Sequence, residues 1–122
     1  MAPFDNSILI ENVFDEQALI ASRQWQELQQ GVFISPIYDY PNGPRAAFLH
    51  YLPGASVPMH THRGLEHILI LHGSQRDGDR IYTKGALIIH NLDTQHDIVS
   101  SEGCLALGIW EKAVEFNKTN VL

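Results

Sequence analysis

Turn-forming residues recur along this chain and leave only short apolar runs between them. Turns are predicted at residues 41–44, Pro53-Gly54, Asp77-Gly78, Gly85 and Glu102-Gly103. The runs between the turns are rich in Val, Ile, Leu, Tyr and Phe, and predict strands over residues 31–35, 46–52, 65–72, 80–83, 86–91, 96–100 and 105–110. Short strands at such regular spacing indicate an all-β sandwich or barrel.

The N-terminal part has a different pattern. Residues 15–28 contain helix formers with apolar Leu19, Ile20 and Trp25, which predicts one short helical segment. Residues 8–10 predict an extra strand. Further along, Asp77-Gly78 predicts a tight hairpin, because glycine accepts the positive φ that such a turn needs.

Size and charge narrow the class of protein. With 122 residues, 13.7 kDa and 44% hydrophobic residues, the chain is expected to form one domain over residues 1–122 with a real core. Eight Lys and Arg against 14 Asp and Glu give a net charge of −6, which argues against nucleic acid and anionic membranes as partners. No apolar run reaches the length of a membrane span, no Lys or Arg precedes Arg23, and Cys104 has no disulfide partner. We therefore expect a cytoplasmic protein.

Histidines are concentrated in the middle of the chain, where six of the seven lie between residues 60 and 96. His60 and His62 are two positions apart, so in a strand both imidazoles project from the same face. Glu66 follows after Gly64, where the chain can bend and return a carboxylate to that face. Two histidines and a carboxylate are a common ligand set for a divalent metal ion.

A fourth metal ligand is predicted from a separate strand. His96 follows the polar turn at residues 91–95 and begins the predicted strand 96–100. The candidate metal ligands are therefore His60, His62, Glu66 and His96. The remaining histidines are interpreted as surface or core residues, with His67 facing away from Glu66 because adjacent strand residues alternate; these are His50, His67, His72 and His90.

The spacing of these residues resembles the cupin superfamily. The first cupin motif reads Gly54, five residues, His60-Thr-His62, three residues, Glu66, six residues and Gly73. The second motif keeps its spacing from Gly85 to His96, but Asn91, Asp93 and Ser100 replace its usual Pro, Gly and Asn. This resemblance implies a double-stranded β-helix, the cupin jelly-roll barrel, with its core at about residues 31–116 and a short helical segment before it.

Residues from about 25 to 116 are similar to the ChrR-like cupin domains in particular. The matching features are Trp25, Gly31-Val32, Arg45-Ala46 and the run from Pro53 to Glu66. In that subfamily the cupin domain of an anti-sigma factor binds zinc, which implies the same four ligands here. Sigma-factor binding belongs there to a separate N-terminal helical domain with paired cysteines. We therefore expect a free-standing metal cupin without sigma-factor binding.

Two functions follow from this ligand set. Four protein ligands close a tetrahedral Zn²⁺ site, which suits a metal-binding protein that binds or senses a small molecule. The same ligands leave two positions on six-coordinate Fe²⁺ or Mn²⁺, as a dioxygenase or other oxidoreductase acting on a small diketone, acid or aromatic compound would need. One divalent ion per chain is expected, with Zn first and Fe, Mn or Ni as alternatives, and whether the protein is an enzyme stays open. A carbohydrate isomerase is a weaker alternative, because its catalytic residues cannot be located.

Further expectations concern the barrel interior and assembly. The candidate liners of the interior are Ile68, Ile70, Ile98 and Ile109. Tyr51, Tyr82 and Trp110 are aromatic candidates near its mouth, with core packing as the favoured role of each. Arg45 and Arg63 are candidates to receive a carboxylate, with simple surface exposure favoured for Arg63. Cys104 is expected to be a buried, inert thiol. Family resemblance implies a homodimer formed through residues 1–30.

Overall fold

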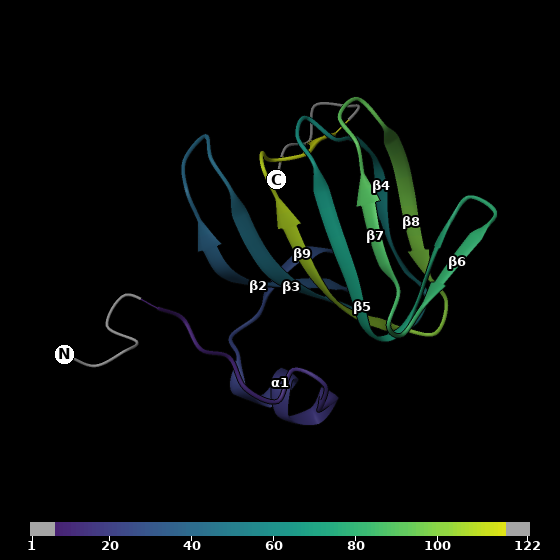
Figure 1. Ribbon diagram of the computed structural model, residues 1–122. Coiled ribbons are helices and arrows are strands. Elements are labelled where there is room, and N and C mark those ends of the chain that lie inside the picture. Colours follow the sequence, from purple (N-terminus) through teal and green to yellow (C-terminus); the bar gives the residue numbers. More distant parts are fainter. Residues whose placement is uncertain (1–6, 117–122) are drawn as a thin grey trace.

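The computed structural model describes residues 7–116 and shows an almost entirely β architecture with one short helix (Figure 1). The elements in chain order are α1 (Glu16–Ser22), β1 (Gln26–Gln29), β2 (Val32–Asp39), β3 (Arg45–Tyr51), β4 (Ala55–Thr61), β5 (Glu66–Asp77), β6 (Arg80–Thr83), β7 (Leu87–His90), β8 (Gln95–Ser100), β9 (Cys104–Trp110) and β10 (Glu115–Phe116). This confirms the predicted all-β cupin fold with an N-terminal helical segment.

The strands form two antiparallel sheets that curl toward each other. The first sheet has the order β1-β2-β3-β9-β5-β7, and the second joins β6, β5, β8, β4 and β10. In Figure 1 the first sheet lies in front and to the left, and β4 and β8 lie behind on the right.

Strand β5 belongs to both sheets. Residues 66–73 pair with β9, whereas residues 74–77 pair with β6. The change of sheet falls at Gly73, whose φ is 77°, and a Cβ there would overlap the carbonyl group of Gly103. One strand therefore carries Glu66 on one wall of the barrel and Gln75 and Asp77 on the other.

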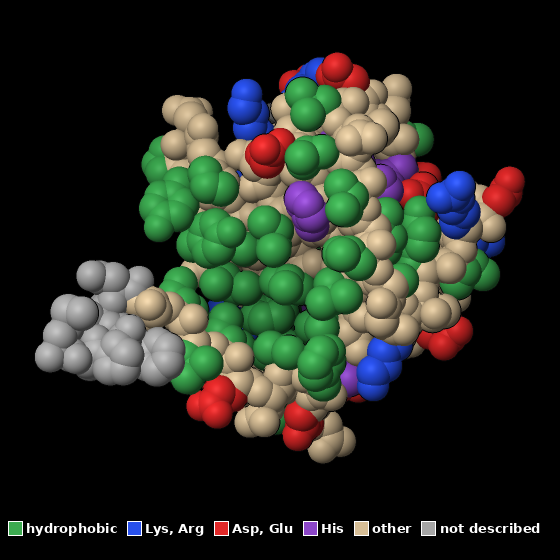
Figure 2. Space-filling view, viewed as in Figure 1, with side chains coloured by type: hydrophobic (Ala, Val, Ile, Leu, Met, Phe, Trp, Pro, Cys, Tyr) green, Lys and Arg blue, Asp and Glu red, His purple; other side chains and the backbone are tan. Residues whose placement is uncertain are grey.

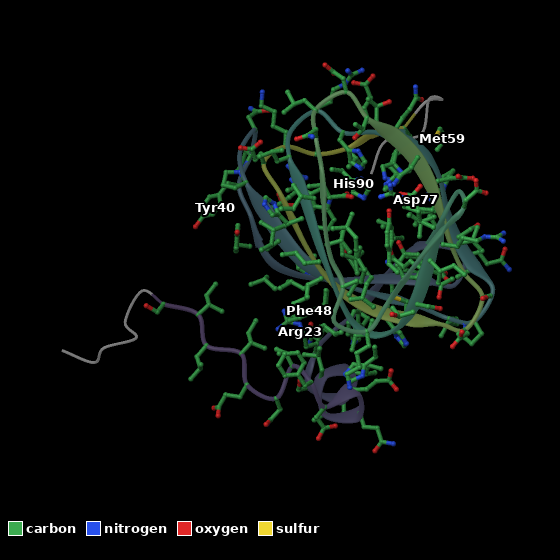
Figure 3. All side chains as sticks on the ribbon, turned by 45° about the vertical axis from the view of Figure 1, so that its right-hand side comes forward. Arg23, Tyr40, Phe48, Met59, Asp77 and His90 are labelled. Carbon is green, nitrogen blue, oxygen red and sulfur yellow. The ribbon has the colours of Figure 1, made fainter. Side chains whose placement is uncertain are left out.

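Apolar side chains form a core inside the barrel and a second core outside it. The inner core includes Val32, Leu49, Ile70, Ile98 and Ala106. The outer core packs α1 against the first sheet, and its buried members are Leu19, Phe48, Leu71 and Leu105. Arg23, which follows α1, fixes the helix against the first sheet. Its guanidinium lies 5.0 Å from the Phe48 ring centre (Figure 3). Its Nε donates a hydrogen bond to Ser35 Oγ at 2.7 Å.

The helix is shorter than the sequence predicts. It begins after Asp15, whose Oδ1 accepts a hydrogen bond from the Ala18 amide at 3.1 Å. It ends at Ser22, and Trp25 Nε1 donates to the free carbonyl of Ile20 at 3.0 Å. The predicted helical residues 26–28 instead lie in β1, because pairing with β2 supplies their backbone partners. The strand predicted at residues 8–10 is absent, since that segment is in no sheet ladder.

All seven predicted strands occur; the strand at residues 80–83 has the predicted bounds, and the other six have shifted ends. The largest change is in β5, which continues five residues beyond the predicted end at His72 and reaches Asp77. The hairpin there is confirmed, with Gly78-Asp79 between β5 and β6 and a positive φ at Gly78. Strand β4 was not predicted as a run, because Pro58 and its polar neighbours interrupt the apolar pattern.

Part of the outer face of the first sheet carries exposed apolar side chains. Leu87, Ile89 and Ile109 are 61%, 53% and 38% exposed, and Figure 2 shows hydrophobic side chains gathered over this sheet. The prediction that Ile109 lines the interior is wrong, because it pairs with His67 on the outward face. Within residues 7–116 there is no helix long and apolar enough to cross a membrane.

Candidate metal centre

One side of the centre is built from a row of paired residues across the first sheet. Glu66, the first residue of β5, is in register with Trp110 of β9 and His90 of β7. Trp110 is in turn in register with Arg45 of β3. Residues paired in this way project from the same face of a sheet, so all four side chains point into one end of the barrel.

The other side of the centre comes from the second sheet. His60 of β4 is in register with His96 of β8, after a bulge between Val57 and His60. His62 follows the end of β4, where its amide donates to the Thr94 carbonyl at 2.9 Å and its carbonyl accepts from the Asp93 amide at 2.8 Å. These backbone bonds hold His62 beside the strand and let its ring face inward with His60.

The structure brings together all four side chains predicted as metal ligands. Each is buried, with exposed fractions of 5% for His60, 1% for His62, 4% for Glu66 and 8% for His96. His60 Nε2 and His96 Nε2 are 3.0 Å apart. Glu66 Oε1 lies 3.1 Å from His62 Nε2 and 3.9 Å from His96 Nε2. The four groups therefore converge on one point.

Each of the three rings is oriented through its other nitrogen. His60 Nδ1 donates to the Pro58 carbonyl at 2.9 Å, and His96 Nδ1 donates to Asp77 Oδ2 at 2.8 Å. His62 Nδ1 lies 2.9 Å from Thr94 Oγ1. That hydroxyl already donates its proton to the Asn91 carbonyl at 2.7 Å, so it accepts from His62.

These bonds place the proton of each neutral ring on Nδ1 and leave three bare Nε2 lone pairs facing the centre. Two of them are 3.0 Å apart, and His62 Nε2 has no hydrogen-bond partner in the described part of the chain. Burial lowers the pKa of His60, which favours its neutral form. Lone pairs and a carboxylate that converge in this way repel one another unless a cation lies between them, so the residues fit a divalent metal ion.

Glu66 is held by Trp110. The indole Nε1 donates to Glu66 Oε2, which leaves Oε1 directed at the histidines. Burial raises the pKa of the Glu66 carboxyl, but His62 in its protonated form and the Trp110 N–H together lower it more, and the net pKa lies below the ordinary value. The group is thus a carboxylate at neutral pH. The Trp110 ring lies over Gly108, where any Cβ would overlap the six-membered ring.

His90 is a fifth member of the cluster that the sequence analysis did not select. Its ring stacks on that of His62, with centroids 4.9 Å apart and an interplanar angle of 8°. Its Nε2 is 3.8 Å from Glu66 Oε1, and His90, Glu66 and His96 form a second group that can hold a metal ion. Figure 3 shows His90 and Asp77 pointing into the same end of the interior. In the sequence, His90 could have been identified by its position two residues from Ile88, because residues two apart in a strand project from the same face.

A cavity of about 270 Å³ adjoins the cluster. Its wall includes the candidate liners Ile68 and Ile98 and also the aromatic residues Tyr51, Tyr82 and Trp110. Ile70 is in the inner core but not in this wall. Ala47 leaves space in the row next to Glu66 and Trp110, where a larger side chain would fill it, whereas its neighbour Gly108 makes room for the Trp110 ring.

The two arginines proposed to receive a carboxylate differ in position. Arg45 lies in the cavity wall, with its Nη2 3.4 Å from Asp39 Oδ1. Arg63 is on the surface, as the favoured interpretation of the sequence has it, and there it pairs with both carboxylate oxygens of Glu115 and with Asp93. Cys104 is buried as predicted, and burial raises its pKa to about 12.

Comparison with known families identifies the same kind of domain. Residues 15–110 match the family model described as the ChrR cupin-like domain. The anti-sigma-E factor ChrR of Cereibacter sphaeroides is 34% identical over 98 residues, which cover 77% of this chain and 45% of that protein. The chain thus spans less than half of this curated relative.

Solved structures agree with this fold. The crystal structure of Rhodobacter sphaeroides SigE in complex with the anti-sigma ChrR matches with a TM-score of 0.65 and 29% identity, over 72% of this chain and 48% of that chain. An acetylacetone dioxygenase from Acinetobacter johnsonii matches with a TM-score of 0.75 and 10% identity, over 100% of this chain and 84% of that chain. At such low identity the second likeness shows the fold alone.

Proposed function

The chain belongs to the family of ChrR cupin-like domains, and we propose that it holds one divalent metal ion at His60, His62, Glu66 and His96. In this proposal the ion forms the end of the adjoining cavity and binds one end of a small molecule there. The protein then acts as a metal-dependent binder or sensor. When bound, the ion supplies a Lewis-acidic centre to which an oxygen atom of the small molecule can attach.

The observation that supports the metal site best is the orientation of the three rings. Each Nδ1 is committed to an outward acceptor, namely the Pro58 carbonyl, the Thr94 hydroxyl or the Asp77 carboxylate. Such outer hydrogen bonds are the usual means by which proteins orient metal-binding histidines. A purely structural histidine cluster would be expected to bond through both ring nitrogens instead.

The donor set favours zinc among the candidate ions. Three imidazoles and one carboxylate suit Zn²⁺, which the general order of affinities places above Mn²⁺ and Fe²⁺. Fe, Mn and Ni remain alternatives because imidazole and carboxylate ligands also suit these ions. His90 gives the site room for a fifth protein donor, since its Nε2 lies 3.8 Å from Glu66 Oε1.

Metal analysis tests the proposal directly. Untagged protein prepared without chelators is expected to contain about one divalent ion per chain by elemental analysis. The double variant His60→Ala/His96→Ala is expected to contain none, while His67→Ala, which lies on the outward face beside Glu66, keeps the ion. Stoichiometric metal in the double variant, or no uptake by the unaltered protein, would refute the site.

A second candidate function is a metal-dependent dioxygenase acting on a small diketone, acid or aromatic compound. It is favoured by the cavity, which lies directly beside the cluster and is lined by Glu66, His60, His90 and His96 as well as apolar groups. Such a cavity has room for a substrate next to the ion. Oxygen consumption by iron-loaded protein with small β-diketones would support this function, and zinc content with no oxygen uptake would favour the binder.

We also propose that the protein forms a homodimer, to which both residues 1–30, of which 1–6 lie outside the described residues, and the outer face of the first sheet contribute. Leu87, Ile89 and Ile109 form an exposed apolar patch there, and such patches often mark contact surfaces. Sedimentation of the unaltered protein and of Ile89→Lys tests this. We expect the unaltered protein to sediment as a dimer and Ile89→Lys to sediment as a monomer. If the unaltered protein is a monomer, the proposal is refuted.

A further inference from the structure

The cavity contains a buried polar group that the metal site does not use. Gln75 of β5 is 3% exposed and lies in the cavity wall, and its side-chain Nε2 has no hydrogen-bond partner within residues 7–116. Buried amide groups are almost always paired, because an unpaired one loses its bonds to water without compensation. An unpaired donor in a cavity wall therefore indicates a partner that enters the cavity.

The position of Gln75 relative to the metal centre is fixed by the strand. Asp77, two residues further along β5, accepts the hydrogen bond of His96 at 2.8 Å. Residues two apart in a strand share a face and are separated by about 6.6 Å. Gln75 thus lies one strand repeat deeper than the metal centre, on the same wall.

The surroundings of Gln75 decide the kind of partner. At its depth the wall consists of apolar side chains and tyrosine rings. Ile98 on β8 and Ile68 and Ala47 on the facing sheet are apolar, and Tyr82, which is in register with Gln75, lines the same cavity. The Gln75 amide also interacts with the Cys104 sulfur, and this interaction lowers the thiol pKa in opposition to burial, but sulfur is a weak acceptor and leaves the amide without a strong partner. Arg45 lies in the row of Trp110 and Glu66 at the mouth, so it is not available to neutralise an anion at this depth.

We propose that Gln75 is a specificity-determining residue, whose amide N–H donates a hydrogen bond to a neutral oxygen at the inner end of the bound small molecule. The inference rests on the proposed function, since the outer end of that molecule binds the metal ion. The ligand class is a short compound with a metal-binding oxygen group, an apolar middle and a carbonyl, hydroxyl or ether oxygen roughly 6 Å further in. A carboxylate at the inner end is disfavoured, because burying a charge without a partner is costly.

Two matched probes test this inference. The compounds 4-oxopentanoate and pentanoate share a carboxylate and a chain of the same length, and differ in the inner carbonyl. Binding to cobalt-loaded protein is measured by titration of the visible spectrum. We expect 4-oxopentanoate to bind roughly five- to tenfold more tightly than pentanoate, as one buried hydrogen bond would give.

The variant Gln75→Met removes the amide and keeps the length of the side chain. It is expected to abolish the preference for 4-oxopentanoate and to leave pentanoate binding and metal content unchanged. The control Gln17→Met makes the same change on the exposed surface of α1 and should keep the preference.

Stability separates a ligand role from a structural one. Without ligand, Gln75→Met should melt at the same temperature as the unaltered protein or higher, because it removes an unpaired buried amide. A clear loss of stability would mean that the amide is paired within the fold, which overturns the inference. Equal binding of the two probes would also overturn it and leave the proposed function intact, whereas failure of both probes to bind would count against the proposed function itself.

Discussion

Asp77 and His96 are joined across two strands by a hydrogen bond of 2.8 Å between Oδ2 and Nδ1. Asp77 is the last residue of β5, whose first residue is Glu66, so the same strand provides one candidate ligand and orients another. The carboxylate also increases the electron density on the His96 ring. This contact links the hairpin between β5 and β6 to the metal centre.

The first prediction concerns this contact. Asp77→Ala should lower the affinity for the metal ion by about 10- to 100-fold, because His96 loses the partner that fixes its ring and its proton. A competition titration against a chromophoric chelator measures the change. Asp79→Ala, in the same hairpin but exposed, is the control, and equal affinities of the two variants would show that Asp77 has no role at the centre.

The second prediction concerns His90. His90→Ala should keep one ion per chain and weaken its binding by less than about tenfold, because four donors remain. The reason is that His90 is half-buried and lies further from Glu66 than His62 does, at 3.8 Å against 3.1 Å. Elemental analysis and the same competition titration measure this. Complete loss of the ion would make His90 an essential ligand.

The third prediction concerns Gly108. Gly108→Ala should destabilise the protein by about 1–3 kcal/mol, because the added methyl group overlaps the Trp110 ring and displaces its bond to Glu66. Denaturant unfolding measures the free energy, and tryptophan fluorescence reports the displacement. In a Trp110→Ala background the same change should cost little. If the cost is the same in both backgrounds, the ring does not cause it.

The fourth prediction concerns metal removal. The ion would connect His60 and His96 on the second sheet to Glu66 on the first, so the folded state binds it much better than the unfolded chain does. Binding at a hundredfold excess over Kd stabilises by about 2.7 kcal/mol, and chelation should therefore lower Tm by roughly 10 °C. The His60→Ala/His96→Ala variant should show no such response. An unchanged Tm of the unaltered protein would argue against a bound ion.

The fifth prediction concerns Cys104. Burial raises its pKa to about 12, so at pH 8 the reactive thiolate is roughly a thousandfold scarcer than in the unfolded chain. A thiol reagent should react only in denaturant. The free energy of unfolding should fall as pH rises from about 9 to 12, because over this range the Cys104 thiol loses its proton only in the unfolded chain. Rapid labelling under native conditions would contradict the burial.

The sequence predicted the parts of the molecule in which local pattern and packing agree. The spacing of His60, His62, Glu66 and His96 identified four groups that the fold brings together, because strand alternation is a local property. Ile109 was assigned to the wrong face. Near the mouth the outer face of β9 is left uncovered, so apolar residues occur on both sides and alternation alone does not identify the interior.

Other features depended on tertiary structure. The helix ends at Ser22 because residues 26–29 find a better partner in β2, which no local pattern reveals. Surface exposure of Arg63 was the favoured interpretation, but its partner Glu115, far away in the sequence, could not be predicted from a local pattern. His90 and Gln75 belong to the site because the sheets curl and because β5 crosses from one sheet to the other. No sequence motif marks either feature.

The crossing of β5 from one sheet to the other sets the dimensions of the cavity in two independent ways. Along the strand, Gln75 is separated from Asp77, the partner of His96, by one two-residue backbone repeat of about 6.6 Å, and no substitution of a side chain alters that interval. Across the cavity, the width depends on Ala47, which fills little space, and on Trp110, whose ring lies over Gly108. The backbone of β5 therefore limits one dimension of a bound molecule, and side chains in the cavity wall limit the other. Related domains can change which molecules they bind by changing those side chains, without altering the metal centre.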